Sequence, residues 1–276
     1  MSSFARPASS IVSLTNPFTS STLSTIRAAL AATYSRAEDH PEYAYDPKET
    51  HAAVLVPLCN VNNKPGILLE VRGKLRTHSG ETDASSLEAA LRETHEEVGI
   101  HPDQVEILGR FGPPELSLGG MRQPRPTGAP TRGGAVTAES PTKLSDSDAD
   151  TEDRSHDPLP SLSLASLTLS QREVAHAFHL PFSAAVSPPR LNLYQFRGSE
   201  PYWSIDVSDI IASAKESDQA DVVSSNRVSG QGIEFCNNED SLKRDEIGGG
   251  REGRLEAWGL TGWYLTTFFR TLGVYR

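Results

Sequence analysis

Cysteine, long apolar runs and basic charge are all scarce in this 276-residue chain. Its two cysteines, Cys59 and Cys236, lie far apart and outside any CxxC or Cys/His spacing, so we expect neither structural zinc nor a disulfide framework. No apolar run approaches the roughly 18 residues of a membrane span, so we expect no membrane partner. The 36 Asp and Glu outnumber the 26 Lys and Arg, which argues against nucleic acid as a partner.

The N-terminal segment has a composition of its own. The first 37 residues contain arginine, serine and threonine but no Asp or Glu, which is typical of a transit peptide. The alternative is a tail that leads into an ordinary helix at Thr22–Thr33. In both interpretations the sequence predicts an N-terminal tail over residues 1–44, with Thr22–Thr33 as a candidate helix.

The rest of the chain has the pattern of a single mixed α/β domain, which we place at residues 45–270. Two short apolar runs, Ala52–Leu58 and Ile67–Val71, are expected to pair as a hairpin around a turn at Asn60–Gly66. The later expected elements are a helix from Asp83 to Gly99, a strand at Val105–Gly109, an ordered segment at Glu173–Ile211 and a closing helix at Leu255–Phe269.

Two polar stretches interrupt this domain, at about residues 119–161 and 214–254. Both are rich in glycine, serine and aspartate and lack apolar periodicity. Segments of this kind bury too little apolar surface to offset the entropy of ordering them. We therefore predict disordered insertions at both places.

Three glutamates in the expected helix, Glu93, Glu96 and Glu97, carry the clearest chemical signal. At about 100° per residue they fall within one arc of roughly 100°, so their carboxylates share one helix face. Like charges so placed repel one another, but a hard divalent cation that prefers oxygen ligands turns the repulsion into a binding site. The alternative is an acidic helix face that contacts only solvent.

The sequence around these glutamates resembles a known family motif. Residues 92–100, RETHEEVGI, match the second half of the Nudix box, R-E-U-x-E-E-x-G-U, except that Thr94 replaces an apolar residue. By that resemblance Glu93, Glu96 and Glu97 ligate Mg²⁺ or Mn²⁺ against a substrate diphosphate. Arg92 is then the residue that fixes the geometry of the loop and helix.

The stretch before the motif is similar to one subfamily. Residues 68–81, LLEVRGKLRTHSGE, resemble the segment that precedes the box in coenzyme A diphosphatases. The resemblance implies that this stretch binds coenzyme A or a related nucleoside diphosphate derivative. The candidate binding residues are Arg72, Lys74, Arg76, His78, Gly80 and Glu81. The basic members suit phosphate through charge-assisted hydrogen bonds, and the alternative is a basic exposed turn.

Two later segments resemble the same subfamily, at Glu173–Pro181 and Trp258–Thr261. Core packing is the expected role of their aromatic residues Phe178 and Trp258. Glu173 is a candidate for orienting the attacking water or a further metal ion. It joins Arg92 and the three glutamates as a candidate catalytic residue.

The resemblance breaks after Glu81. The family continues there with a strand and loop of the type V-x-F-P-G-G-x-x-D, whereas this chain continues directly with Thr82. About 10 residues are absent, including glycines that let the backbone approach the phosphate. Three interpretations stay open: an active coenzyme A diphosphatase, a catalytically impaired Nudix-fold protein that binds a nucleotide or a partner, and a truncated product of an ordinary enzyme gene.

The resemblance implies a fold and a reaction. The fold is the Nudix α/β/α sandwich with a mixed sheet, here interrupted by the two insertions. The reaction is attack of water on the diphosphate of coenzyme A, which gives adenosine 3′,5′-bisphosphate and 4′-phosphopantetheine. Resemblance and N-terminal composition favour a peroxisomal or mitochondrial location, with the cytoplasm as an alternative. The sequence makes no prediction of oligomeric state.

Overall fold

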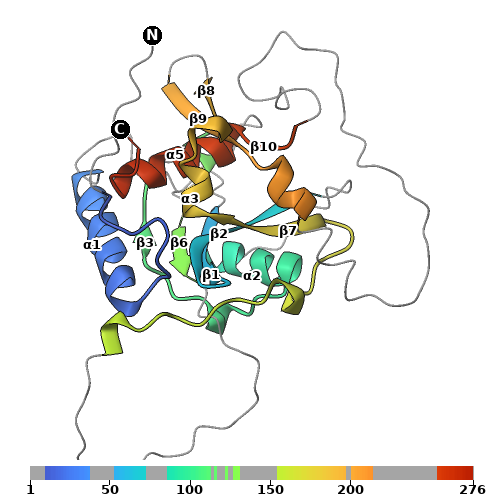
Figure 1. The fold of residues 1–276 in the computed structure, drawn as a ribbon, viewed down its shortest axis with the longest axis horizontal. Helices are drawn as coiled ribbons and strands as arrows, with labels where there is room; N and C mark the ends of the chain where they lie inside the picture. Colours follow the sequence, from blue (N-terminus) through green and yellow to red (C-terminus); the bar gives the residue numbers. More distant parts are fainter. Residues whose placement is uncertain are drawn as a thin grey trace, which may run out of the picture.

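The computed structural model describes residues 10–37, 53–72, 86–112, 115–116, 122–123, 127–130, 154–196, 200–213 and 254–275 (Figure 1). Its larger elements are α1 (Ser20–Ala37), β1 (Leu55–Val61), β2 (Lys64–Arg72), α2 (Ser86–Val98), β7 (Val174–Pro181), β8 (Leu191–Phe196), β9 (Glu200–Asp206) and α5 (Gly259–Thr271). The shorter ones are β3 (Gly109–Arg110), β4 (Glu115–Leu116), β5 (Arg122–Gln123), β6 (Thr127–Pro130), α3 (Phe182–Ala185) and β10 (Glu256–Ala257).

The central sheet has five strands in the order β3-β6-β1-β2-β7. Strands β1 and β6 run parallel, and the other neighbours are antiparallel, so the predicted α/β class with a mixed sheet is confirmed. The hairpin between β1 and β2 turns at Asn62 and Asn63, both of which have positive φ. Two such residues form the tight turn that matches strand twist. Pro65 and Gly66 therefore belong to β2 rather than to the longer turn that was expected.

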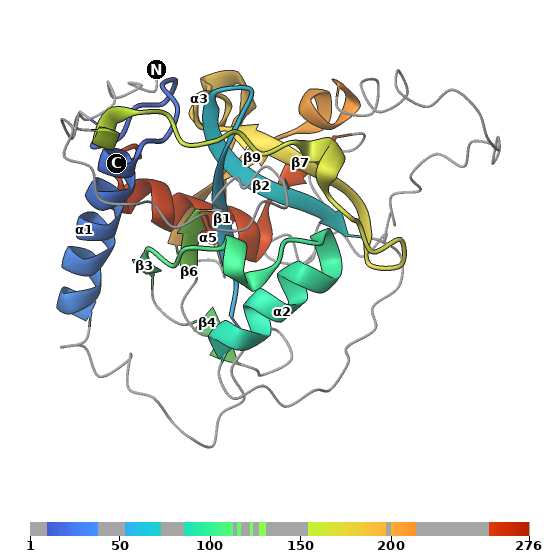
Figure 2. The ribbon, with the colours of Figure 1, turned by 90° about the horizontal axis from the view of Figure 1, so that it is seen from below.

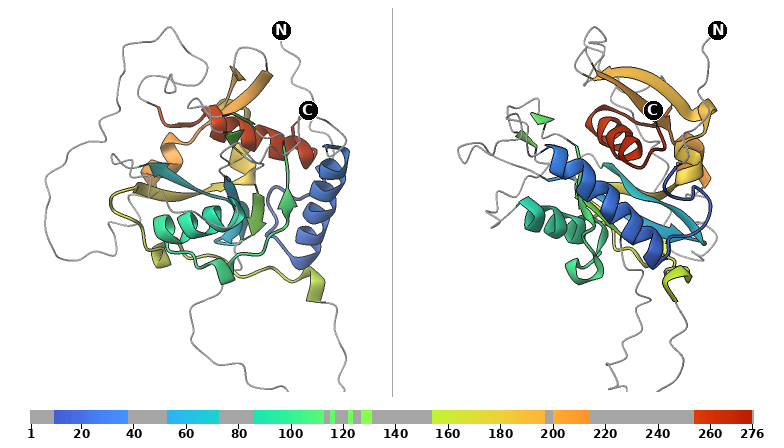
Figure 3. Two further views of the ribbon diagram at one scale, coloured as in Figure 1. Left: turned by 180° about the vertical axis from the view of Figure 1, so that it is seen from behind. Right: turned by 90° about the vertical axis from the view of Figure 1, so that its left-hand side faces the viewer.

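Helices cover both faces of this sheet. Figure 3 shows α2 on one side of the central strands and α5 on the other. Alternate residues of β2 point to the two sides: Ile67 lies in the core cluster that contains α5, and Leu68 lies in the cluster that contains Val98 of α2. The three layers, α2, the central sheet and α5, form the α/β/α sandwich that was predicted.

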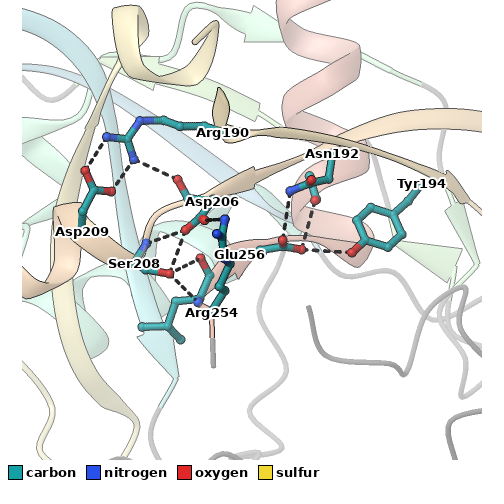
Figure 4. Close-up of polar contacts among 10 residues, drawn as sticks. Arg190, Asn192, Tyr194, Asp206, Ser208, Asp209, Arg254 and Glu256 are labelled. Carbon is teal, nitrogen blue, oxygen red and sulfur yellow. Dashed lines mark hydrogen bonds and ion pairs between the residues drawn. The ribbon is translucent and has the colours of Figure 1, made fainter. Parts of the chain in front are cut away.

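A second sheet, in the order β10-β9-β8, covers the outer side of α5. The Glu256 carboxylate holds it together, because it accepts hydrogen bonds from Asn192 Nδ2 at 3.0 Å, Ser204 Oγ at 3.2 Å and Tyr194 OH at 3.3 Å (Figure 4). Since each donor lies on β8 or β9, one β10 side chain crosslinks all three strands.

Helix α1 belongs to the packed domain. Ile26 and Leu30 are fully buried in the main core cluster, and Arg27 forms an ion pair with Glu106. The predicted helix at Thr22–Thr33 is therefore confirmed, but it is not part of a loose tail. Removing it would open the core that it shares with α5. None of the helices in the described ranges is long and apolar enough to cross a membrane.

Three expectations about local structure are wrong. At Val105–Gly109 only the last residue enters a strand, β3. The expected helix at Leu255–Phe269 begins only at Gly259, because Glu256–Ala257 pairs with β9 as β10. Strands β5 and β6 and the ordered residues 154–161 lie inside the stretch predicted to be a disordered insertion. The rest of that stretch, and the second insertion apart from Arg254, fall outside the described residues.

Residues 157–170, which begin inside that stretch and end beyond it, run along the edge of the domain as an extended return segment (Figure 2). It pairs with β1 through a bridge between Asn60 and Ser161, and Leu159 N–H donates to Phe18 C=O at 2.8 Å. Its leucines cover the small core on the α2 side of the sheet. It therefore connects α1, β1 and α2 before the chain enters β7.

Candidate active site

Helix α2 carries the motif, and the return segment completes its C-terminal end. The helix stops where Gly99 adopts a φ of +78°, a conformation that side chains other than glycine rarely adopt. The carbonyls of the last turn then need partners outside the helix. Thr168 N–H donates to Val98 C=O at 3.2 Å, and Ser170 N–H donates to Glu97 C=O at 2.9 Å. The position of the helix is thus fixed by a segment some 70 residues later in the chain.

The three glutamates of the motif differ in exposure and in their contacts. Glu96 is exposed and forms an ion pair with Arg92 at 2.9 Å, one helical turn earlier. Glu93 is also exposed, whereas Glu97 is half-buried beside the sheet. Arg92 therefore contacts one of the three glutamates directly.

A carboxylate that the sequence analysis missed, Glu70, lies on the sheet opposite α2. On β2 it follows Leu68 at a spacing of two, so both side chains point toward α2, while Leu69 and Val71 pack against the α5 side. A charged residue at a half-buried position in an otherwise apolar strand was the available signal.

The carboxylates of Glu70, Glu93, Glu97 and Glu173 affect one another electrostatically. Burial, with smaller contributions from the charges of Glu70, Glu93 and Glu173, raises the pKa of Glu97 to about 7. Burial also raises the pKa of Glu70, with contributions from Glu173 and Glu93. Arg72 opposes both shifts. Four carboxylates and one guanidinium, from β2, α2 and the start of β7, therefore share one electrostatic environment.

Glu173 reaches this group because of strand register. It immediately precedes β7, whose first residue, Val174, pairs with Arg72 of β2. Its carboxylate oxygen Oε2 accepts a hydrogen bond from Ser170 Oγ at 3.3 Å. The structure thus brings Glu173 to the end of β2 that also carries Glu70.

The donor set fits a hard divalent cation in its chemistry, because carboxylates supply only oxygen ligands. Its arrangement fits less well. Within the described ranges, no group of three or more His, Cys, Asp or Glu side chains is placed so that it could hold a metal ion. Glu96, one of the expected ligands, instead forms its ion pair with Arg92.

Of the candidate phosphate-binding residues, Arg72 is the one that the structure describes. The other candidates, Lys74, Arg76, His78, Gly80 and Glu81, lie outside the described residues, as does the junction with Thr82. Arg72 is exposed, and its charge acts on Glu70 and Glu97. Phe178 is buried in the core as expected, and Trp258 is partly buried.

Comparisons with known proteins agree with the motif. No family model matches the chain. It is 44% identical over 79 residues to the uncharacterized Nudix hydrolase NudL of Enterobacter sp. (strain 638), and 42% identical over 79 residues to that of Escherichia coli (strain K12). Over this segment the chain is related to Nudix hydrolases. Each alignment covers 25% of this chain and 41% of the relative, so the chain matches less than half the length of these curated relatives.

The alignment with NudL is longer than the part of this chain that it covers. The 79 aligned positions exceed a quarter of the 276-residue chain, so some positions of the Nudix relative have no counterpart here.

Two solved Nudix structures show only slight likeness. The Nudix domain of Shewanella oneidensis NrtR, solved in complex with ADP-ribose, is 14% identical with a TM-score of 0.31, over 51% of this chain and 81% of that one. A MutT/Nudix family protein from Enterococcus faecalis is 17% identical with a TM-score of 0.26, over 58% of this chain and 54% of that one. Likeness at these scores is too slight to identify a fold.

Proposed function

We propose that this protein is a metal-dependent hydrolase of the Nudix type that cleaves the diphosphate linkage of coenzyme A or a related nucleoside diphosphate derivative. The observation that carries this proposal is the position of Glu97. It lies on the motif helix, half-buried, within electrostatic reach of carboxylates from β2 and from the start of β7. A solvated acidic helix face would not raise the pKa of one of its members to about 7.

Different residues of the candidate active site are proposed to bind the metal ion, bind the phosphate and orient the attacking water. Glu93 and Glu97 on α2, with Glu70 opposite, would supply oxygen donors for Mg²⁺ or Mn²⁺ after their side chains had turned from the arrangement described above. When bound, such a cation neutralises charge on the diphosphate and lowers the pKa of water. Arg72 lies beside these carboxylates and carries the charge that suits a phosphate. Glu173, which immediately precedes β7, is the proposed group for orienting the attacking water or a further metal ion.

Coenzyme A is the proposed substrate because residues 68–81 resemble the coenzyme A diphosphatases. The basic residues Arg72, Lys74 and Arg76 fit a ligand with several phosphates. The proposed products are adenosine 3′,5′-bisphosphate and 4′-phosphopantetheine, and the proposed location is a peroxisome or mitochondrion.

A panel assay tests the proposal. The purified full chain is incubated with Mg²⁺ or Mn²⁺ and with coenzyme A, ADP-ribose or NADH, and the products are separated by chromatography. We expect cleavage of coenzyme A in preference to the other two compounds. Absence of cleavage of all three with either cation would contradict the proposed activity.

A second candidate function is binding without turnover. Two observations favour it: the ion pair between Arg92 and Glu96, and the absence of a three-ligand metal group within the described ranges. In this case coenzyme A or ADP-ribose would bind to the chain and remain intact. Calorimetric binding without product in the same panel would identify this function.

A further inference from the structure

Ser170 connects the motif helix α2 with the residues that lead into β7. Its backbone N–H, its carbonyl and its hydroxyl all take part in these contacts. Its backbone N–H donates to Glu97 C=O at 2.9 Å. Its carbonyl accepts from Glu173 N–H at 3.1 Å and from Val174 N–H at 2.9 Å. Its hydroxyl Oγ donates to Glu173 Oε2 at 3.3 Å. One residue therefore contacts the motif helix, the first residue of β7 and the side chain of Glu173.

The sequence explains this geometry. Ser170 and Glu173 have the S-x-x-E spacing in which a serine and a glutamate stabilise a turn between them. Here the turn leads into a strand, β7, instead of a helix. The serine N–H is consequently free for another acceptor, and the unsatisfied carbonyl at the end of α2 takes it.

The three backbone hydrogen bonds of Ser170 and the hydrogen bond of its hydroxyl have different effects. The backbone contacts fix the turn to α2 and do not depend on the side chain at position 170. Of the polar groups of Ser170, the hydroxyl is the one that contacts the Glu173 carboxylate. Loss of the hydroxyl should therefore change the orientation of the carboxylate without detaching the turn.

We propose that Ser170 is a positioning residue, which holds the Glu173 carboxylate in register with the end of α2 that carries Glu97. The inference rests on the function proposed above. The inference adds to the candidate active site a residue of the return segment, which lies outside both family-like segments, residues 68–81 and 92–100. A hydroxyl at position 170 is the chemical requirement, so threonine should replace serine and alanine should not.

Three variants of the full chain test this role: Ser170→Ala, Ser170→Thr and, as a matched control, Ser166→Ala. Ser166 lies on the same segment and donates its hydroxyl to Ser163 C=O at 2.7 Å, away from Glu173. With coenzyme A and Mn²⁺ we expect Ser170→Ala to lower kcat about tenfold or more and to change KM less than about twofold, because a displaced catalytic group costs rate rather than binding. Ser170→Thr should recover most of the lost kcat, and Ser166→Ala should match the parent chain.

Crystal structures of the parent, Ser170→Ala and Ser170→Thr chains provide a readout that does not need activity. We expect the Glu173 carboxylate to change rotamer in Ser170→Ala and to keep its place in Ser170→Thr. An unmoved carboxylate in Ser170→Ala, or equal kcat values for Ser170→Ala and Ser166→Ala, would overturn the inference. A parent chain without turnover would contradict the proposed function, and the crystal structures would still decide whether Ser170 orients Glu173.

Discussion

The side-chain amide of Asn60 hydrogen-bonds both backbone polar groups of Phe18. Its Oδ1 accepts from Phe18 N–H at 2.7 Å, and its Nδ2 donates to Phe18 C=O at 3.1 Å and to Leu159 C=O at 2.9 Å. Asn60 lies on β1 and is almost fully buried. A single side chain of the central sheet thus satisfies backbone groups of two segments that have no sheet of their own.

Replacing Asn60 with alanine should destabilise the fold by about 2–4 kcal/mol, because buried backbone groups would lose their partners. Asn16→Ala, at an exposed position, is the control and should change stability by less than about 0.5 kcal/mol. Urea denaturation followed by circular dichroism measures both. Equal midpoints for the two variants would show that Asn60 does not hold the segments in place.

Glu97→Gln should abolish measurable Mn²⁺ binding and leave the metal-free fold intact or more stable. The raised pKa of Glu97 means that its carboxylate, once ionised, opposes folding. Stability of the parent should therefore fall as the pH rises from about 4.5 through about 7, and Glu97→Gln should reduce this loss. Calorimetric titration and thermal melts at pH 5 and pH 8 check the two parts.

Glu96→Gln is the informative comparison. The family resemblance predicts that it, too, abolishes Mn²⁺ binding. The ion pair with Arg92 would have to break before Glu96 could serve as a ligand, so a variant that keeps the parent's affinity would remove Glu96 from the metal site. Unchanged affinity in both variants would remove the motif glutamates from metal binding altogether.

The missing half of the motif should limit turnover. Inserting the family-like segment VSFPGGRTDE between Glu81 and Thr82 should raise kcat toward coenzyme A at least about tenfold, since small displacements of catalytic groups cost large factors in rate. Steady-state kinetics on both chains measure the change. Equal turnover would show that the return segment alone positions α2 well enough.

His179 should make folding sensitive to acid. Burial lowers its pKa to about 4, with a smaller opposing effect from the backbone of Cys59 and a smaller lowering effect from Lys64. The unfolded chain then binds a proton that the folded chain does not, so stability should fall as the pH drops from about 6.5 to about 4, by up to about 3 kcal/mol. His179→Gln should flatten this part of the stability profile, and His156→Gln, at an exposed position, should not. Denaturant titrations at pH 7, 5.5 and 4 measure these profiles. If the stability of the parent and of His179→Gln falls in parallel, His179 is not the origin of the acid sensitivity.

The sequence predicted the elements whose signals are local. The apolar runs of β1 and β2, the glycine that ends α2 and the amphipathic pattern of α2 depend on neighbours within a few residues. The partnerships between distant segments were not predictable in the same way. Strand β6 has no apolar alternation, yet it pairs with β1 from Leu55 to Leu58, and Glu256 begins a strand only because β9 lies beside it.

The same distinction applies to the candidate site. Spacing on one helix was enough to single out Glu93, Glu96 and Glu97. It did not separate them, because the contact of Glu96 with Arg92 and the burial of Glu97 depend on the sheet behind the helix. Glu70 joins the site through strand alternation, and Ser170 joins it through a backbone contact that no side-chain pattern records.

The course of the return segment has a consequence for a chain cut within residues 131–153. The first fragment would keep α1, α2 and the strands β3, β6, β1 and β2, and the second would keep β7, β8, β9 and α5. Neither fragment alone completes the five-stranded sheet or covers both faces of that sheet with helices. Asn60, Val98 and Glu97 in the first offer acceptors to the backbone of Leu162, Thr168 and Ser170 in the second. The two pieces should therefore reassemble without a covalent link, as a split protein whose two halves each supply part of the carboxylate group.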